Sequence, residues 1–241
     1  MSMTKSISRA EITSSSGYEK VVSFIKDQLI SGALNEGDML LPERDLAIAL
    51  GVSRPVVREA LRALAIIGVV EVLHGVGTMV RRPNSQTLGE FFSIGLAPHS
   101  QIIEDVIQAR IAIECQAIRL ACRFATAADF MQLEARLAMI ERTLGDAVEG
   151  ARADFEFHRT IVQASRSQAL ISIYAVISDL LMRSHVDRRL KINADSAVQS
   201  MVDAHRDLIA VLRAGVPDAA DLALRQHFTI GADKDWAPGK P

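Results

Sequence analysis

Three histidines and one aspartate in the second half of the chain have the spacing and surroundings of metal ligands. Asp154 and His158 are spaced i, i+4, so on a helix they project side by side from one face. His205 and His227 each stand among apolar residues in segments with helical periodicity. Three imidazoles and a carboxylate on neighbouring helices suit a divalent transition metal. An alternative stays open, because one such histidine is more often a hydrogen-bonded core residue or a surface residue, and Asp154 can be an exposed charge.

Arg110 has the chemistry to recognise an anion in the same region. It lies with Glu114 on a predicted helix whose apolar residues, among them Ile107 and Ala117, recur at helical spacing. A guanidinium that faces the interior of a helix bundle suits bidentate binding of a carboxylate. A surface ion pair between Arg110 and Glu114 is the alternative. His185, on a later helix, either edges the same site or lies on the surface.

These side chains need helices to position them, and the second part of the chain is predicted to be helical almost throughout. Thr126 is a candidate N-cap, and Gly215 to Pro217 separates the last two helices. We therefore predict a mainly α fold with an antiparallel bundle of six or seven helices. The expected elements are a short helix or turn at Leu88–Gly95 and helices at Ser100–Phe124, Ala127–Leu144, Gly150–Ala164, Gln168–Leu190, Asp195–Ala214 and Asp218 to about Ile230.

The segment Leu40–Val80 has a different pattern, in which two short helices precede a β-hairpin. Gly51 can adopt the left-handed conformation that closes the first helix, and Ser53 can cap the second, with Pro55 in its first turn. With a preceding helix, these elements predict an N-terminal winged helix-turn-helix. The expected elements are helices at Tyr18–Ser31, from near Glu43 to Gly51 and from the residue after Ser53 to Gly68, and strands at Val69–Leu73 and Thr78–Arg82 joined by the turn His74–Gly77.

The arginines of this segment are placed for contact with DNA. A helix fits the major groove with its N-terminal residues at the base edges. Arg54 and Arg58 lie at that end of the second helix, and Arg44 starts the preceding one. His74, at the tip of the wing, can enter the neighbouring minor groove. Each arginine alone would more often belong to a solvated helix face, so the prediction of DNA binding rests on the arrangement as a unit.

Composition excludes several classes of protein. The 241 residues are 49% hydrophobic and only 5% aromatic, which favours aliphatic helices over a β-sandwich. The formal net charge of −2 excludes a uniformly basic nucleic-acid coat but allows a local arginine cluster. We see no apolar run of about 18 residues and no apolar core near the N-terminus, so we expect neither a membrane span nor a secretory signal. Cys115 and Cys122 are expected to be free thiols in a cytoplasmic protein.

The pattern changes after Arg82, which indicates a domain boundary. Pro83 stops the second strand of the hairpin, and helical periodicity then replaces the β pattern. The expected organisation is a flexible tail (1–16), the winged helix-turn-helix (17–82), a linker with a short helix (83–99), a helical domain (100–231) and a tail (232–241).

Four short motifs carry a family resemblance in the first third of the chain. They are Gly37-x-x-Leu40-x-Pro42-Glu43-Arg44-x-Leu46-Ala47, Gly51-Val52-Ser53-Arg54, Arg58-Glu59-Ala60-Leu61 and His74-Gly75-x-Gly77-Thr78. In these motifs the chain resembles the DNA-binding domain of the GntR family of bacterial transcription regulators. The resemblance implies that Arg44, Arg54, Arg58 and His74 contact DNA, with Ser53 and Gly75 near the phosphates. Leu41 departs from the family pattern, which often has proline there.

A second, looser resemblance covers most of Ser100 to Ile230. Asp154-x-x-Phe157-His158, His205-x-x-Leu208-Ile209 and the closing His227 are similar to the FCD ligand-binding domain of FadR-type GntR regulators. In many of these proteins the four positions bind a metal. The resemblance implies effector binding and dimerisation by this domain. It also implies that Arg110 holds the carboxylate of an effector whose other oxygens reach the metal. Zn²⁺ is the first expectation, with Ni²⁺, Mn²⁺ or Co²⁺ as alternatives.

These features together predict a cytoplasmic, metabolite-responsive transcription regulator rather than an enzyme. A homodimer is expected, because paired recognition helices read palindromic double-stranded operator DNA. A small organic acid would change operator affinity, and repression relieved by the effector is the commoner behaviour in the family. Two rivals remain at this stage. One is a metal-dependent enzyme acting on a small organic acid, for which no nearby general base is recognisable, and the other is a purely structural metal.

Overall fold

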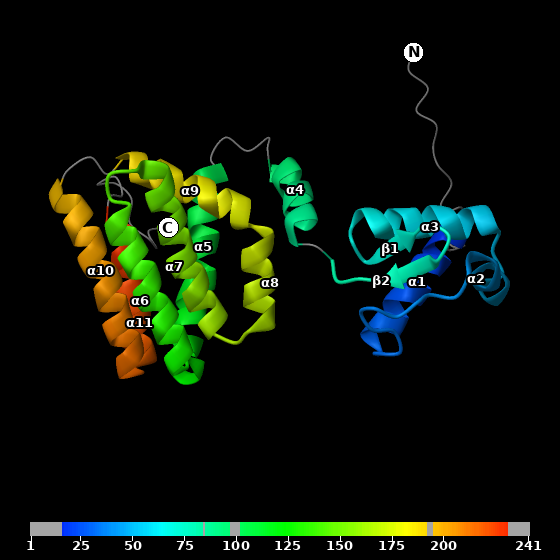
Figure 1. The fold of residues 1–241 in the computed structure, drawn as a ribbon, viewed down its shortest axis with the longest axis horizontal. Helices are drawn as coiled ribbons and strands as arrows, with labels where there is room; N and C mark the ends of the chain where they lie inside the picture. Colours follow the sequence, from blue (N-terminus) through cyan, green and yellow to red (C-terminus); the bar gives the residue numbers. More distant parts are fainter. Residues whose placement is uncertain (1–15, 84, 97–101, 192–194, 231–241) are drawn as a thin grey trace, which may run out of the picture. The chain divides into compact units, whose positions relative to one another are not determined.

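The computed structural model describes residues 16–83, 85–96, 102–191 and 195–230. The expected N-terminal tail, apart from Ser16, and the expected C-terminal tail lie outside these residues, as does part of the expected linker. The chain separates into two compact units, divided between Leu88 and Gly89. The described residues form eleven helices and one two-stranded sheet, which confirms the predicted fold class (Figure 1).

The first unit contains three helices followed by an antiparallel hairpin. Helix α1 begins after a capping box in which Ser16 and Glu19 satisfy each other's backbone N–H groups. The strands pair in register from Val70 opposite Val80 to Leu73 opposite Gly77. The elements are α1 (Gly17–Ile30), α2 (Glu43–Leu50), α3 (Arg54–Ile66), β1 (Val70–Leu73) and β2 (Gly77–Val80).

The turn between α2 and α3 forms largely as the sequence predicts. Gly51 closes α2 with φ of 63°, which confirms the expected left-handed cap. Ser53 occupies the N-cap position of α3, and Pro55 lies in the first turn. The expected capping by the Ser53 hydroxyl is wrong, however, because this side chain makes no cap hydrogen bond.

The hairpin is attached to the helices through the segment before α2. Leu40 N donates to Thr78 O at 2.8 Å, and Val80 N donates to Asp38 O at 2.8 Å. Beneath them, Val21 and Ile25 of α1 share one apolar core with residues of α2, α3 and both strands. The hairpin is therefore fixed to the same core as α3.

The second unit is a bundle in which long helices lie side by side (Figure 1). Helix α7 packs against α5, α6 and α9, while α11 packs against α5 and α10. The division between the units falls within α4 (Ser85–Leu96), whose residues from Gly89 onward belong to the second unit. The other elements are α5 (Ile102–Phe124), α6 (Ala127–Arg142), α7 (Ala147–Ala164), α8 (Gln168–Val176), α9 (Ser178–Lys191), α10 (Asp195–Ala214) and α11 (Pro217–Thr229).

Two helix predictions in this unit need correction. The single helix expected over Gln168–Leu190 is two helices, α8 and α9, bent by 65° at a break between Val176 and Ser178. No glycine or proline marks this break; Ile177 there is buried among side chains of α5, α7 and α9. Helix α7 begins at Ala147, earlier than expected, because the Asp146 side chain accepts from the first N–H groups of the helix.

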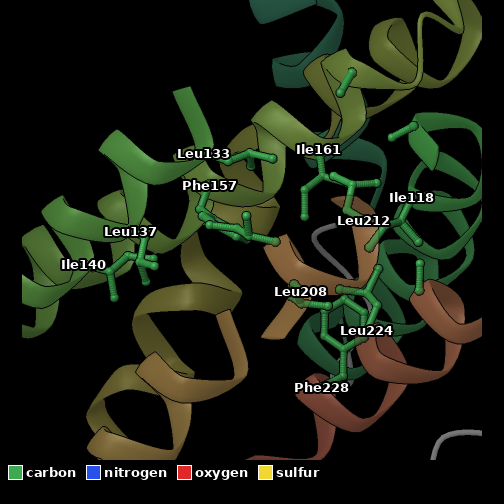
Figure 2. Packing of buried hydrophobic residues seen from close by; sticks show 14 of the residues in the cluster. Ile118, Leu133, Leu137, Ile140, Phe157, Ile161, Leu208, Leu212, Leu224 and Phe228 are labelled. Atoms are coloured by element: carbon green, nitrogen blue, oxygen red, sulfur yellow. The ribbon is translucent and has the colours of Figure 1, made fainter. Parts of the chain in front are cut away.

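The main core lies between α5, α6, α7, α10 and α11 (Figure 2). Phe157 of α7 is fully buried there, in one cluster with Leu208, Leu224 and Phe228. Burial of one such side chain contributes on the order of 2–3 kcal/mol. The helix faces that carry the candidate ligands are therefore held by apolar packing next to them.

The described residues include one bent pair of helices and two cysteines. No single helix there is long and apolar enough to cross a membrane, and only the bent pair α8 and α9 passes by length and composition when taken together. Cys115 and Cys122 are free thiols, which confirms the expectation.

Candidate metal centre and DNA-contacting surface

Asp154, His158, His205 and His227 meet inside the bundle. Their potential ligand atoms all lie within 4.8 Å of one another, and the four residues are at most 2% exposed. His158 Nε2 lies 3.1 Å from His227 Nε2, and Asp154 Oδ1 lies 2.6 Å from His205 Nε2. The spacing predicted from the sequence thus brings together side chains from α7, α10 and α11.

The four side chains fit a divalent transition metal. The donor set is three imidazole nitrogens and one carboxylate oxygen, which such ions prefer. With metal–ligand bonds of about 2.1 Å, neighbouring ligand atoms lie about 3.0 Å apart in octahedral and about 3.4 Å apart in tetrahedral coordination. The separations of 2.6, 3.1 and 3.5 Å among these atoms lie around these values.

The hydrogen bond on the far side of His205 strengthens this fit. His205 Nδ1 lies 2.7 Å from the carbonyl oxygen of Met201, which can only accept. In the neutral ring the proton is therefore on Nδ1, and the Nε2 lone pair faces Asp154 Oδ1. Burial lowers the pKa of His205, although Asp154 acts in the opposite direction. At this separation either a proton or a metal ion lies between the two atoms, and the centre of the cluster suits a metal ion.

Glu114 connects the candidate metal ligands to Arg110. Its Oε1 accepts from Arg110 Nε at 2.7 Å and from the Tyr174 hydroxyl at 2.9 Å. Its Oε2 lies 2.6 Å from His158 Nδ1. A proton on His158 Nδ1 is stabilised by this carboxylate, which leaves Nε2 for the metal. The Arg110–Glu114 pair does form, but it is buried, so the surface-pair alternative is wrong.

The charges of these groups follow from their surroundings. Burial alone would raise the pKa of Glu114, but Arg110 and His158 outweigh it and lower this pKa to about 2. Burial likewise opposes ionisation of Asp154, yet His185 and His205 hold its pKa well below the usual range. Burial opposes the charge of Arg110, but Glu114 keeps its pKa raised. Both carboxylates are therefore ionised and Arg110 is positively charged.

His185 of α9 belongs to the same cluster, which the sequence pattern left undecided. It is fully buried, and its Nδ1 lies 2.7 Å from Asp154 Oδ2. Burial, followed by the charge of Arg110, lowers the pKa of His185 to about 3, so the ring is neutral. A neutral ring that donates from Nδ1 orients the Asp154 carboxylate and leaves Oδ1 for the centre.

The predicted DNA contacts of the first unit are exposed. Arg44, Arg54 and Arg58 all have exposed side chains, as expected for a surface that reads DNA. Arg58 donates to both carboxylate oxygens of Glu43, with its closest contact at 2.9 Å. This hydrogen bond, against the opposing effect of burial, lowers the pKa of Glu43. Sequence reasoning missed this partner, although Glu43 is the first residue of α2.

The remaining candidates lie at the turn and at the wing. Ser53 is exposed at the start of α3. His74 and Gly75 are exposed between β1 and β2, where Gly75 has φ of 73°, a conformation that favours glycine. A side chain at position 75 would therefore be strained, although nothing lies within 4 Å of an added Cβ.

Comparisons with known proteins match both units. The model of the FCD domain matches residues 105–229, and that of the bacterial regulatory proteins of the gntR family matches residues 17–80. The HTH-type transcriptional regulator LutR of Bacillus subtilis is 29% identical over 202 residues, which cover 83% of this chain and 92% of LutR. The HTH-type transcriptional repressor NanR of Edwardsiella tarda is 29% identical over 216 residues, which cover 87% and 82%.

A solved structure gives the same result. Streptococcus agalactiae GntR superposes with a TM-score of 0.66 at 25% identity, covering 88% of this chain and 97% of its own. The matched family and these relatives are transcription regulators, not enzymes. The chain therefore belongs to the gntR family of bacterial regulatory proteins and joins a helix-turn-helix DNA-binding domain to an FCD effector-binding domain.

Proposed function

We propose that this protein is a cytoplasmic, homodimeric repressor whose FCD domain binds a divalent metal ion and a small organic acid. The observation that carries the proposal is the buried Asp154–His158–His205–His227 cluster, with the charged Arg110 connected to it through Glu114. Zn²⁺ is the first candidate because the donor set is mostly imidazole, and Ni²⁺, Mn²⁺ and Co²⁺ are the alternatives.

Each side chain has a separate task in this proposal. Asp154, His158, His205 and His227 would hold the ion, which attracts oxygen atoms of the acid as a Lewis acid. Arg110 Nη2 is buried and has no hydrogen-bond acceptor among the described residues, so it is available to a carboxylate. Glu114 keeps Arg110 in place by accepting a hydrogen bond from Arg110 Nε.

The DNA-binding part of the proposal assigns α3 to the major groove of a palindromic operator. Arg54 and Arg58 would meet base edges or phosphates, Arg44 and Ser53 the backbone, and the wing residues His74 and Gly75 the adjacent minor groove. Binding of the acid would favour one arrangement of the bundle and change operator affinity by a coupling free energy of about 1–3 kcal/mol. The name of NanR as a repressor supports the proposal that this protein represses transcription.

The first experiment is thermal unfolding of the zinc-loaded protein with a panel of small organic acids, repeated after chelation. A ligand at one hundred times its Kd stabilises the folded state by about 2.7 kcal/mol. We expect one acid to raise the midpoint by about 5–10 °C, and chelation to abolish that rise. If chelation lowers the midpoint and no acid shifts it, the metal is structural and Arg110 is not an effector ligand.

The acid found in this way is then tested on DNA. Operator sequences are selected from a random library with the zinc-loaded protein, and their affinity is measured with and without the acid. Arg54→Ala should abolish operator binding and leave the thermal response to the acid intact. Loss of both responses in this variant would refute the assignment of separate DNA-binding and effector-binding units.

A further inference from the structure

A second arginine, Arg189, is buried beside the candidate metal centre. It lies one helical turn after His185 on α9 and is 7% exposed. Its Nη1 contacts the Met201 sulfur at 3.0 Å, and a thioether is a weak acceptor. Its Nε and Nη2 have no hydrogen-bond acceptor among the described residues. Buried guanidinium N–H groups without acceptors are costly, so this side chain is incomplete without an anion or water.

The sequence makes room for this guanidinium. A Cβ atom at Gly150 of α7 would lie 2.7 Å from both Arg189 Nε and Nη2. Gly150 precedes Asp154 by one helical turn, and Met201 precedes His205 by one turn. Arg189 therefore lies about one turn from the layer that contains Asp154 and His205.

Arg110 marks the other end of the same stripe on α7. Gly150, Asp154 and His158 follow one another at i, i+4 and i+8, with Arg189 at Gly150 and the Glu114–Arg110 pair at His158. Gly150 and His158 are about 12 Å apart along the axis of α7. A diacid of about four to six carbons, with one guanidinium group at each end, can bridge this length.

The buried charges favour a dianion over a monoanion. Around the cluster, Asp154 and Glu114 balance Arg110 and Arg189 when the imidazoles are neutral, as metal ligation requires. A divalent ion then adds two positive charges to a water-poor site. Burying uncompensated charge costs free energy, and a single carboxylate would neutralise only one of the two positive charges of the ion. Two carboxylates restore neutrality.

We infer that the effector is a short dicarboxylate, with one carboxylate at the metal centre and Arg110 and the other at Arg189. This inference rests on the proposed function, because it concerns the ligand of the same site. It assigns to Arg189 the role of binding the second carboxylate, so Arg189 gives diacids a higher affinity than monoacids of the same length.

The test compares matched acids by calorimetric titration of the zinc-loaded full chain. The pairs are succinate with butyrate, glutarate with valerate, and adipate with hexanoate. At least one diacid should bind ten times more tightly than its monoacid, or better. Arg189→Gln should weaken that diacid at least tenfold and change the monoacid less than twofold. Arg189→Lys keeps the charge without the planar fork and should be intermediate.

Controls separate recognition from folding. Arg183→Gln makes the same charge change at an exposed position of α9 and should leave both affinities unchanged. Without acid, zinc-loaded Arg189→Gln should unfold at the wild-type temperature or above it, because it loses an uncompensated buried charge. Unfolding well below that temperature would make Arg189 structural and overturn the inference.

The remaining outcomes are distinguishable. Equal binding of diacids and monoacids by the wild-type protein, or equal losses for both in Arg189→Gln, would overturn the inference and leave the proposed metal-assisted acid site standing. Binding of no acid by the zinc-loaded protein would overturn the proposed effector class, and the inference with it.

Discussion

Glu114 interacts with several residues, some of which lie far from it in the sequence. It accepts hydrogen bonds from Arg110 and Tyr174 and lies against His158, while being fully buried. Its single negative charge therefore supports a candidate metal ligand and a candidate effector ligand simultaneously. A partner of this kind sets the proton position and the basicity of a metal-binding imidazole.

Glu114→Gln should weaken zinc binding by about 10- to 100-fold, because the carboxylate beside His158 becomes a neutral amide. It should also destabilise the metal-free protein by on the order of 3 kcal/mol, since Arg110 loses its buried counter-charge. Competition with a chromophoric chelator measures the affinity, and urea unfolding measures the stability. Tyr174→Phe is the matched control, because it removes one hydrogen bond to Glu114 without a change in charge. Zinc affinity equal to that of the wild type in Glu114→Gln would contradict the role given to Glu114.

Sequence reasoning at this scale found the residues on a shared helix face and missed those whose partners lie on other helices. The i, i+4 spacing of Asp154 and His158 needs only one helix to be interpreted. His185 and Arg189 also show this spacing, but it becomes informative only once α9 is known to pack against α7. The sequence alone places Glu114 beside Arg110 on one helix face, whereas the contact of Glu114 with His158 depends on the packing of α5 against α7.

Among the helices, the start of α6 is tied to the end of α7. Thr126 and Asp129 form the capping box of α6, which confirms the predicted Thr126 cap. Asp129 also accepts from the Arg166 guanidinium, and Arg166 follows α7 with φ of 56°. Burial opposes the charge of Asp129, but the bonds from Thr126 and the charge of Arg166 lower its pKa. The carboxylate therefore fixes the ends of two bundle helices.

Asp129→Asn should lower the unfolding free energy by about 1 kcal/mol at pH 7, the usual contribution of such a cap. Because the pKa of Asp129 is lowered by folding, its stabilisation is present above its unfolded value of about 3.9 and is lost as pH falls through the lower folded value. The difference between wild type and variant should therefore shrink below about pH 4. Urea unfolding of the metal-free proteins between pH 7 and pH 3 measures it, and a difference that is constant over this range would refute the assignment.

Helix positions were largely predictable because caps and apolar periodicity are local signals. The bend between α8 and α9 was not, because Gln168 to Leu190 contains no glycine or proline. The bend follows from tertiary packing, in which Tyr174 of α8 and Leu181 of α9 enter the same buried cluster. Because the cause is packing against other helices, the sequence of this segment alone does not predict the bend.

At the scale of the whole molecule, α4 is the first helix after the winged domain in the chain. Its Gly89 is buried against the end of α8, where an added Cβ would lie 2.5 Å from the Val176 carbonyl oxygen. Val176 directly precedes the bend, after which α9 carries His185 and Arg189 to the candidate site. A displacement of α9 by a ligand would reach α4 through this backbone contact.

Gly89→Ala should therefore reduce the effect of the acid on operator affinity by more than half, because α4 can no longer lie against Val176. Metal and acid affinities should remain within about threefold of wild type, since no ligand residue is touched. Operator binding is measured with and without acid by fluorescence anisotropy, so that the coupling free energy, typically about 1–3 kcal/mol, is obtained directly.

Gly95→Ala supplies the control for this experiment. It lies on the same helix and has no atom within 4 Å of an added Cβ, so it changes helix propensity without changing packing. Full coupling in Gly89→Ala, or an equal loss in Gly95→Ala, would contradict a path through the contact between α4 and α8.

The pairing of Arg58 with Glu43 has a consequence for the ionic strength at which the protein works. A cation that binds a phosphate displaces condensed counterions from DNA, and their release makes affinity fall as salt rises, by a slope of about 0.9 per neutralised phosphate. An arginine that already shares its charge with a carboxylate on the same domain adds little to this slope. A guanine edge, like the Glu43 carboxylate, accepts two N–H groups of a guanidinium, so a contact of Arg58 with guanine would be specific to that base. If Arg58 contacts DNA as proposed, the pair would lower the salt-dependent, sequence-independent part of the affinity and leave a larger share to the bases.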